Sequence, residues 1–219
     1  MSLSANSSDV ARNVNRPAAP LEFYFDFISP FGYLASLRVD ALAATYGREA
    51  RWQSMLTGVS VIKVMGLKPI PETPLKGPYS RRDLARYLRR HGLSLKRDLE
   101  KPPSLPIRAG RAFHWLDSQD PPLAKRFAAA LFDAYWQQDR DIGNVDEVVR
   151  IGEAVGVNGA GLAAAVASGG EGDALLRAAV DRSLALGVFG SPFFLVDGEP
   201  FFGLDKMELL QEWLREGGW

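Results

Sequence analysis

The sequence predicts an α/β fold in which one small sheet is built from both ends of the chain. Residues 21–28 are rich in aromatic side chains and nearly continuous in apolar character, which is typical of a buried strand. The middle of the chain has mainly helical periodicity, and strand patterns return near the end. Because each segment must bury its apolar face, the two ends are expected to fold against each other.

The N-terminal part of this sheet is predicted to be a strand–helix–strand unit. Ser29-Pro30 directly follows the first strand pattern, and Ser is a favoured N-cap while Pro is a favoured first helical residue. Helical spacing continues to Gly47, which supplies a stop. Residues 50–56 predict a second strand, and such a connection is typical of parallel pairing.

The middle of the chain begins with residues 58–78, whose repeated Gly and Pro predict mostly loop. The helices expected after it start from recognisable caps or show one apolar face. They are predicted over 80–91, over 107–116, from Asp120-Pro121, from Asn144 and over 173–186.

The C-terminal part is predicted to be a hairpin followed by a helix. Residues 193–196 and 200–202 flank Asp197-Gly198, the strongest short-range hairpin signal. The total order is strand–helix–strand, a helical block, then strand–strand–helix. This order predicts a thioredoxin-like fold interrupted by a large all-helical insertion.

The expected domains follow from that order. Residues 21–65 and 187–219 form the thioredoxin-like domain, and residues 66–186 form the helical insertion domain with its loop-rich beginning. Residues 1–20 are rich in Ser, Asn, Ala and Pro and are expected to be a flexible tail without the apolar core of a signal peptide.

Composition excludes several classes of protein. The chain has no cysteine, which excludes disulfides, dithiol redox chemistry and thiolate metal sites, and its two histidines do not predict a metal centre. No segment approaches the roughly 18 apolar residues that a membrane span needs. The chain is therefore expected to be a soluble, cytoplasmic protein that binds no metal and no membrane.

Positive charge is concentrated in one region although the totals balance at 26 basic and 26 acidic residues. Residues 76–111 contain eleven Lys or Arg and three acids. The arginines between Arg81 and Arg90 are interpreted as a solvated surface spread over several helical faces. The alternative is a positive rim that attracts anionic ligands. Nucleic-acid binding is not predicted, since no aromatic-interleaved stripe or known binding motif accompanies the charges.

The turn at Ser29-Pro30 allows two interpretations. The first is a helix cap and nothing more. In the second, the Ser29 hydroxyl lies beside unpaired N–H groups at the positive end of a helix, where an anion such as a thiolate is stabilised.

The turn at Ser191-Pro192, just before a predicted strand, also allows two interpretations. The proline can prevent edge pairing, or it can be a cis proline that presents the backbone of Ser191 to a bound peptide. The two Ser-Pro turns together are far more specific than either alone.

Together with residues 202–207, these turns resemble the 2-hydroxychromene-2-carboxylate isomerase and kappa-class glutathione transferase family, relatives of the DsbA oxidoreductases with Ser in place of the redox Cys. The similarity runs from about residue 21 to residue 214. It implies glutathione as cofactor, a homodimer, and cis–trans isomerisation of aromatic-degradation intermediates through reversible thiol addition. A small aromatic or electrophilic molecule would be the substrate.

The resemblance also implies a set of site residues. Ser29 would be the catalytic residue that holds the glutathione thiolate, and Asp205 and Lys206 would contact the γ-glutamyl end, where the family more often has Arg at the second position. The full glutathione-binding set carried over by resemblance is Ser29, Pro30, Phe31, Lys76, Ser191, Pro192, Asp205 and Lys206.

One position departs from the family pattern. The family usually reads Lys-x-x-Gly-Asn-x-Pro where this chain reads Lys63-Val-Met-Gly-Leu67-Lys-Pro. Because Leu67 cannot form the hydrogen bonds of Asn, either glutathione is held differently or the substrate pocket is more apolar. Two alternatives to the isomerase therefore stay open: a kappa-like glutathione transferase and a non-catalytic thioredoxin-fold binding module.

Overall fold

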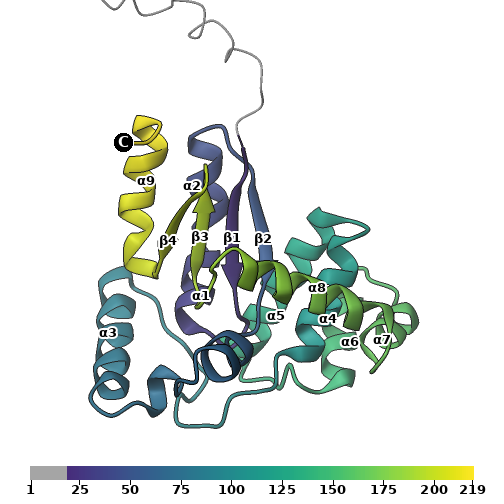
Figure 1. Ribbon diagram of the computed structural model, residues 1–219. Coiled ribbons are helices and arrows are strands. Elements are labelled where there is room, and N and C mark those ends of the chain that lie inside the picture. The colour runs from purple at the N-terminus through teal and green to yellow at the C-terminus, as the bar shows by residue number, and fades with distance from the viewer. Residues whose placement is uncertain (1–18) are drawn as a thin grey trace, which may run out of the picture.

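The computed structural model describes residues 19–219 and contains one four-stranded sheet with the order β2-β1-β3-β4 (Figure 1). Strands β1 (Leu21–Phe25) and β2 (Ala50–Ser54) pair in parallel, and β1 pairs antiparallel with β3 (Phe193–Val196), which is followed by β4 (Glu199–Phe202). Both ends of the chain thus contribute to one sheet, which confirms the predicted thioredoxin-like fold. The tail expected over residues 1–20 lies almost entirely outside the described residues.

The helices that the structure describes surround this sheet, and most begin where the sequence indicates. Asp120 and Asn144 cap their helices as expected, each accepting a hydrogen bond from a backbone N–H in the first turn. In chain order the helices are α1 (Pro30–Ser36), α2 (Val39–Thr45), α3 (Lys76–His91), α4 (Ile107–Asp117), α5 (Pro121–Gln138), α6 (Val145–Ala154), α7 (Gly159–Val166), α8 (Glu171–Ala185) and α9 (Met207–Glu216).

One hydrophobic core joins the sheet to the helical insertion. On β1, the Phe23 ring lies between Phe194 of β3 and Trp52 of β2, with ring centroids 5.5 and 5.4 Å away. The Phe25 ring lies 5.5 Å from Phe113 of α4, in the insertion. Because aromatic pairs of this kind add to the large apolar area that they bury, the insertion stabilises the strand that leads to Ser29.

Helices α4 to α8 form a block on one side of the sheet, whereas α3 lies on the other side, below α9 (Figure 1). The last turns of α8 reach the sheet, where Arg182 forms an ion pair with Glu22 of β1 at 2.8 Å. Among the helices of the middle of the chain, α4 and α8 contact the sheet at β2.

Three sequence-based boundaries differ from the structure. Residues 58–78 were predicted to be mostly loop, but they contain a π-helix (Gly58–Val64) and a 3-10 turn (Ile70–Glu72), because the glycines stand at the ends of the π-helix. Helix α3 begins four residues earlier than predicted. The single helix expected up to Gly47 is two helices, and the hydroxyl of Ser36 donates to the carbonyl of Tyr33 where the first one ends.

No helix among residues 19–219 combines the length and the apolar character that crossing a membrane requires.

Candidate functional site

The two Ser-Pro turns meet at the end of β1. Ser29 caps α1: its Oγ accepts a hydrogen bond from the N–H of Gly32 at 3.1 Å and donates one to the carbonyl of Ser191 at 3.0 Å. In return, the Oγ of Ser191 accepts a hydrogen bond from the N–H of Asp26 at 2.9 Å. Two segments 162 residues apart are thereby joined by reciprocal hydrogen bonds.

Both motif interpretations can now be compared with geometry. The helix cap at Ser29 is present, and the Ser191-Pro192 peptide is cis, as the second interpretation of that turn predicted. The Ser29 hydroxyl hydrogen points to a backbone carbonyl, so it is already engaged in the free protein. Pro30 occupies the first position of α1, and Phe31, in the same first turn, has an N–H without an intrahelical acceptor.

Gly32 permits the close approach of the two turns. A Cβ at this position would lie 2.5 Å from the Oγ of Ser191 and 3.2 Å from the Cβ of Ser29. No other residue type can therefore occupy position 32 without displacing one of the two serines. The sequence contains this glycine in the motif, but only the fold reveals what it faces.

Asp26 follows directly after β1, next to the two turns, and is fully buried. Its carboxylate accepts hydrogen bonds from the N–H and the Oγ1 of Thr57, at 2.8 and 2.6 Å, and from the N–H of Ile28 at 3.2 Å. Burial raises the pKa of Asp26 because it disfavours the charged form, while the Thr57 hydrogen bonds act in the opposite direction. Sequence reasoning missed this residue as part of the site, although an acid inside an aromatic strand pattern is a signal for it.

A second buried group holds the segment before the cis peptide. Ser60, in the π-helix, is buried and donates a hydrogen bond from its Oγ to the carbonyl of Phe189 at 3.1 Å. On the other turn, the Trp136 indole N–H donates to the carbonyl of Phe27 at 3.0 Å. Each Ser-Pro turn is thus fixed by a side chain from another element.

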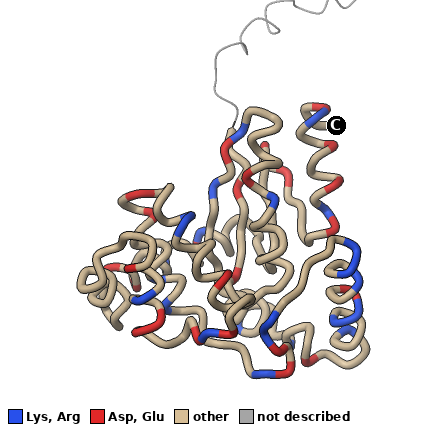
Figure 2. Tube along the Cα trace, turned by 180° about the vertical axis from the view of Figure 1, so that it is seen from behind, with Lys and Arg blue, Asp and Glu red and all other residues tan. Residues whose placement is uncertain are grey.

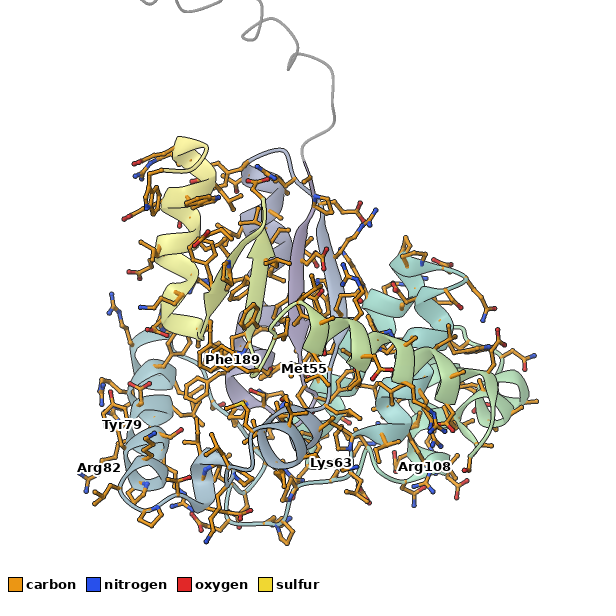
Figure 3. All side chains as sticks on the ribbon, in the orientation of Figure 1. Met55, Lys63, Tyr79, Arg82, Arg108 and Phe189 are labelled. Atoms are coloured by element: carbon orange, nitrogen blue, oxygen red, sulfur yellow. The ribbon has the colours of Figure 1, made fainter. Side chains whose placement is uncertain are left out.

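A cluster of three phenylalanine rings, Phe189, Phe193 and Phe202, lies next to the cis peptide. The Phe189 ring lies 4.5 Å from the Phe202 ring and 5.5 Å from the Phe193 ring. Phe189 remains 41 % exposed and Phe202 remains 40 % exposed. Figure 3 places Phe189 and Met55 at the lower end of the sheet, above the π-helix that carries Lys63. Exposed aromatic rings beside a polar turn can pack against a planar ligand.

The remaining predicted residues lie at the surface. The 3-10 turn Leu204–Lys206 packs against α1, so Asp205 and Lys206 belong to the same end of the molecule as Ser29. The Nζ of Lys206 lies 3.6 Å from the Oδ2 of Asp205. Lys76 opens α3, and all three side chains are exposed. Within residues 19–219, none of them forms a hydrogen bond with Ser29 or Ser191.

Leu67, the residue that departs from the family pattern, is 53 % exposed just after the π-helix. Its N–H donates to the carbonyl of Val61 at 3.0 Å, which ties the backbone to the helix and leaves the side chain in solvent. An apolar side chain there can contact a ligand but can donate no hydrogen bond to it.

These features define a thioredoxin-fold protein in which serine hydroxyls, and no cysteine, meet beside a cis proline. Comparison with known families agrees: the DSBA-like thioredoxin domain matches residues 20–215. The chain belongs to this family. Among the residues that the structure describes, no group of three His, Asp or Glu could hold a metal ion.

Individual relatives confirm the resemblance predicted from the motifs. A 2-hydroxychromene-2-carboxylate isomerase from Sphingobium xenophagum is 27 % identical over 206 residues, which cover 89 % of this chain and 97 % of the relative. A solved 2-hydroxychromene-2-carboxylate isomerase aligns with a TM-score of 0.77 and 23 % identity, covering 90 % of this chain and 94 % of the other.

A third comparison concerns the fold alone. The cytosolic disulfide reductase DsbM from Pseudomonas aeruginosa, solved with GSH, aligns with a TM-score of 0.61 and 18 % identity, covering 90 % of this chain and 98 % of DsbM.

Proposed function

We propose that the protein is a glutathione-dependent enzyme of the 2-hydroxychromene-2-carboxylate isomerase type. The observation that carries this proposal is the hydrogen bond between the Ser29 hydroxyl and the Ser191 carbonyl beside a cis proline. A chain without cysteine cannot perform dithiol exchange itself. Any thiol chemistry at this site therefore needs a thiol from a bound molecule, and the names of the similar proteins favour an isomerase.

The residues at the site fit the chemical groups of glutathione. A thiolate needs hydrogen-bond donors, and the Ser29 hydroxyl and the N–H of Phe31 are the donors at the start of α1. The γ-glutamyl end carries an ammonium and a carboxylate, which fit the adjacent Asp205 and Lys206. Lys76 fits the remaining carboxylate of the tripeptide.

Each of these residues has a distinct role in the proposed reaction. Ser29 turns its hydroxyl hydrogen from the carbonyl of Ser191 to the bound thiolate, which lowers the pKa of the thiol. The freed carbonyl of Ser191 then accepts a hydrogen bond from the backbone of the ligand. When bound, glutathione supplies a nucleophile that adds reversibly to an unsaturated substrate, so that a bond can rotate without net oxidation.

The substrate is proposed to be a small aromatic carboxylate. The exposed rings of Phe189 and Phe202 offer a stacking surface next to the cis peptide. Two other candidates are a kappa-like glutathione transferase and a non-catalytic thioredoxin-fold binding module; Leu67 favours the binding module, because an apolar side chain cannot form the hydrogen bonds of the amide that the family pattern has there. We further propose a cytoplasmic location, as the sequence leads us to expect.

Thermal unfolding with reduced glutathione tests the binding step. A ligand that binds only the folded state adds about 1.4 kcal/mol at ten times its dissociation constant. We expect millimolar glutathione to raise the Tm of the wild type, and S-methylglutathione, which has no thiol, to raise it less. No shift with either compound would favour the non-catalytic binding module and contradict the proposal.

The reaction itself is tested by following 2-hydroxychromene-2-carboxylate in ultraviolet absorbance with and without glutathione. We expect isomerisation only when glutathione is present. Conjugation of glutathione to 1-chloro-2,4-dinitrobenzene without any isomerisation would assign the transferase instead. The Leu67→Asn variant sharpens the distinction, since an added amide is expected to increase the isomerase rate relative to the wild type.

A further inference from the structure

The side-chain hydroxyl of Ser191 carries a hydrogen that the fold does not use. Its Oγ accepts a hydrogen bond from the N–H of Asp26 at 2.9 Å, but within residues 19–219 it donates none. The Ser29 hydroxyl differs, because it donates to the carbonyl of Ser191 at 3.0 Å. A hydroxyl can donate one hydrogen bond in addition to those that it accepts. Ser191 is half-buried, so a bound molecule can reach this unused donor.

The unused donor lies beside the residue that is proposed to hold the thiolate. A Cβ at Gly32 would be 2.5 Å from the Oγ of Ser191 and 3.2 Å from the Cβ of Ser29, so both side chains border the same small space. The Ser29 Oγ also lies 3.0 Å from the carbonyl oxygen of Ser191. An atom bound at the Ser29 hydroxyl is therefore within reach of the Ser191 hydroxyl as well.

The backbone around Ser191 is held on both sides of the residue. Before it, the carbonyl of Phe189 accepts a hydrogen bond from the Oγ of Ser60 at 3.1 Å. After it, the carbonyl of Pro192 accepts one from the N–H of Gly203 at 3.0 Å. The Ser191 hydroxyl is therefore positioned before any ligand arrives, and a donor that is already in place needs no reorganisation when charge develops next to it.

The charged groups of the chain do not take the place of these hydroxyls. Figure 2 shows the Lys and Arg residues of α3 along the outer edge of the molecule. Within residues 19–219, no Lys or Arg forms a hydrogen bond or an ion pair with Ser29, Ser191 or Asp26. Burial raises the pKa of Asp26, which favours its neutral form and so reduces its repulsion of a nearby anion. The donors that can stabilise a thiolate here are therefore neutral hydroxyl and N–H groups.

We propose that the Ser191 hydroxyl donates a second hydrogen bond to the thiolate of bound glutathione, in addition to the one from Ser29. This contact rests on the proposed function, because it needs glutathione at the Ser29 turn. The Ser29 hydroxyl must first leave the carbonyl of Ser191, whereas the Ser191 hydroxyl can donate as soon as the sulfur arrives. Hydrogen bonds to a charged acceptor are roughly twice as strong as neutral ones, so two donors lower the thiol pKa more than one.

A pair of variants with the same shape tests this contact through the thiol pKa of bound glutathione, followed by thiolate absorbance. Ser191→Thr keeps the hydroxyl, and Ser191→Val replaces it with a methyl group. We expect the Thr variant to stay close to the wild type and the Val variant to raise the thiol pKa by about one unit, a tenfold smaller ionisation constant. Circular dichroism verifies folding, since Val leaves the N–H of Asp26 without its acceptor. Should the Val variant not fold, Ser191→Ala gives the same comparison without added bulk.

Combination with Ser29→Ala separates a direct contact from a positioning effect. If both hydroxyls donate to the same sulfur, the double variant should raise the thiol pKa more than either substitution alone. If Ser191 acts only by holding Ser29 in place, the double variant should match Ser29→Ala. S-methylglutathione provides the control ligand, because it has no thiol to ionise. Its affinity is expected to be the same for the Thr and Val variants of Ser191.

Several results would overturn the second hydrogen bond. Equal thiol pKa values in the Thr and Val variants would leave the Ser191 hydroxyl a structural acceptor for the N–H of Asp26. Equal losses of affinity for glutathione and S-methylglutathione in the Val variant would assign its hydrogen to the peptide part of the ligand. A wild type that binds neither compound would remove the proposed function as well. A lowered thiol pKa that depends on Ser29 but not on Ser191 would remove the second hydrogen bond alone.

Discussion

The candidate site has an inner and an outer part that differ in how they are held. In the inner part, Ser29, Ser191 and Asp26 are tied to one another by hydrogen bonds at 2.9 and 3.0 Å. In the outer part, Lys206 and Asp205 are exposed, and their only mutual ion contact is 3.6 Å long. The inner part is therefore formed before any ligand arrives, whereas the side chains of the outer part lie in solvent with little to hold them.

This difference follows from burial. A polar group removed from water must find partners, and the inner groups find theirs on β1, the π-helix and the segment before β3. An exposed charge gains little from a single partner, so the fold positions the backbone of the outer residues but holds their side chains only weakly. Substitutions in the inner part of the site should therefore change both stability and chemistry, while substitutions in the outer part should change ligand binding alone.

The largest expected effect concerns His114, a buried residue of α4. Its Nε2–H donates to the carbonyl of Ser54 at the end of β2, at 2.8 Å, and burial lowers its pKa to about 4. The unfolded chain binds this proton near pH 6.5, so stability from this group is complete above pH 6.5 and is lost as the pH falls towards 4. The loss by pH 4 is about 3 kcal/mol.

Urea unfolding between pH 4.5 and 7.5 measures this dependence. We expect His114→Gln to flatten the slope of the unfolding free energy against pH. The matched control is His91→Gln, since His91 is exposed at the end of α3. Equal slopes in the wild type and the His114 variant would contradict the claim that His114 causes this pH dependence of stability.

The next effect concerns the contact between the two turns. Gly32→Ala places a Cβ 2.5 Å from the Oγ of Ser191 and must displace that hydroxyl from its hydrogen bond with the N–H of Asp26 or shift the turns. Overpacking of this kind is expected to lower stability by about 2 kcal/mol, and glutathione affinity should fall at least about tenfold with it. Gly58→Ala is the control, because nothing lies within 4 Å of its added Cβ. A Gly32 variant that binds glutathione normally would show that the pairing of the turns is unimportant.

The smallest effect is expected in the outer part. Lys206→Met should change the unfolding free energy by less than about 0.5 kcal/mol, since the side chain is exposed. Calorimetric titration should nevertheless show glutathione binding about fivefold more weakly, because an ion pair to the ligand is lost. A large loss of stability without weaker binding would remove the contrast between the two parts.

Much of the fold could be predicted from the sequence because its signals are local. Ser29-Pro30, Asp120 and Asn144 mark helix starts by their own chemistry, and Asp197-Gly198 marks the hairpin. The inner site could be predicted only in part. Thr57 donates a hydrogen bond to the buried carboxylate of Asp26, and Ser60 donates one to the carbonyl of Phe189. Both partners lie far away in the sequence, so no spacing along the chain predicts these contacts.

The position of α3 was equally hidden from the sequence. Its apolar residues predict a helix but not that it lies below α9, away from the other insertion helices (Figure 1).

The most direct test of the central claim is the pKa of the glutathione thiol when bound, followed by thiolate absorbance during a pH titration. The account predicts a wild-type value at least one unit below the ordinary thiol value of about 8.5, because Ser29 donates to the thiolate. Ser29→Ala should raise it by about one unit, since a hydrogen bond to a charged group contributes about 1.5 to 3 kcal/mol. Ser36→Ala, at the other end of α1, should leave it unchanged. The same thiol pKa in the wild type and the Ser29 variant would contradict the account.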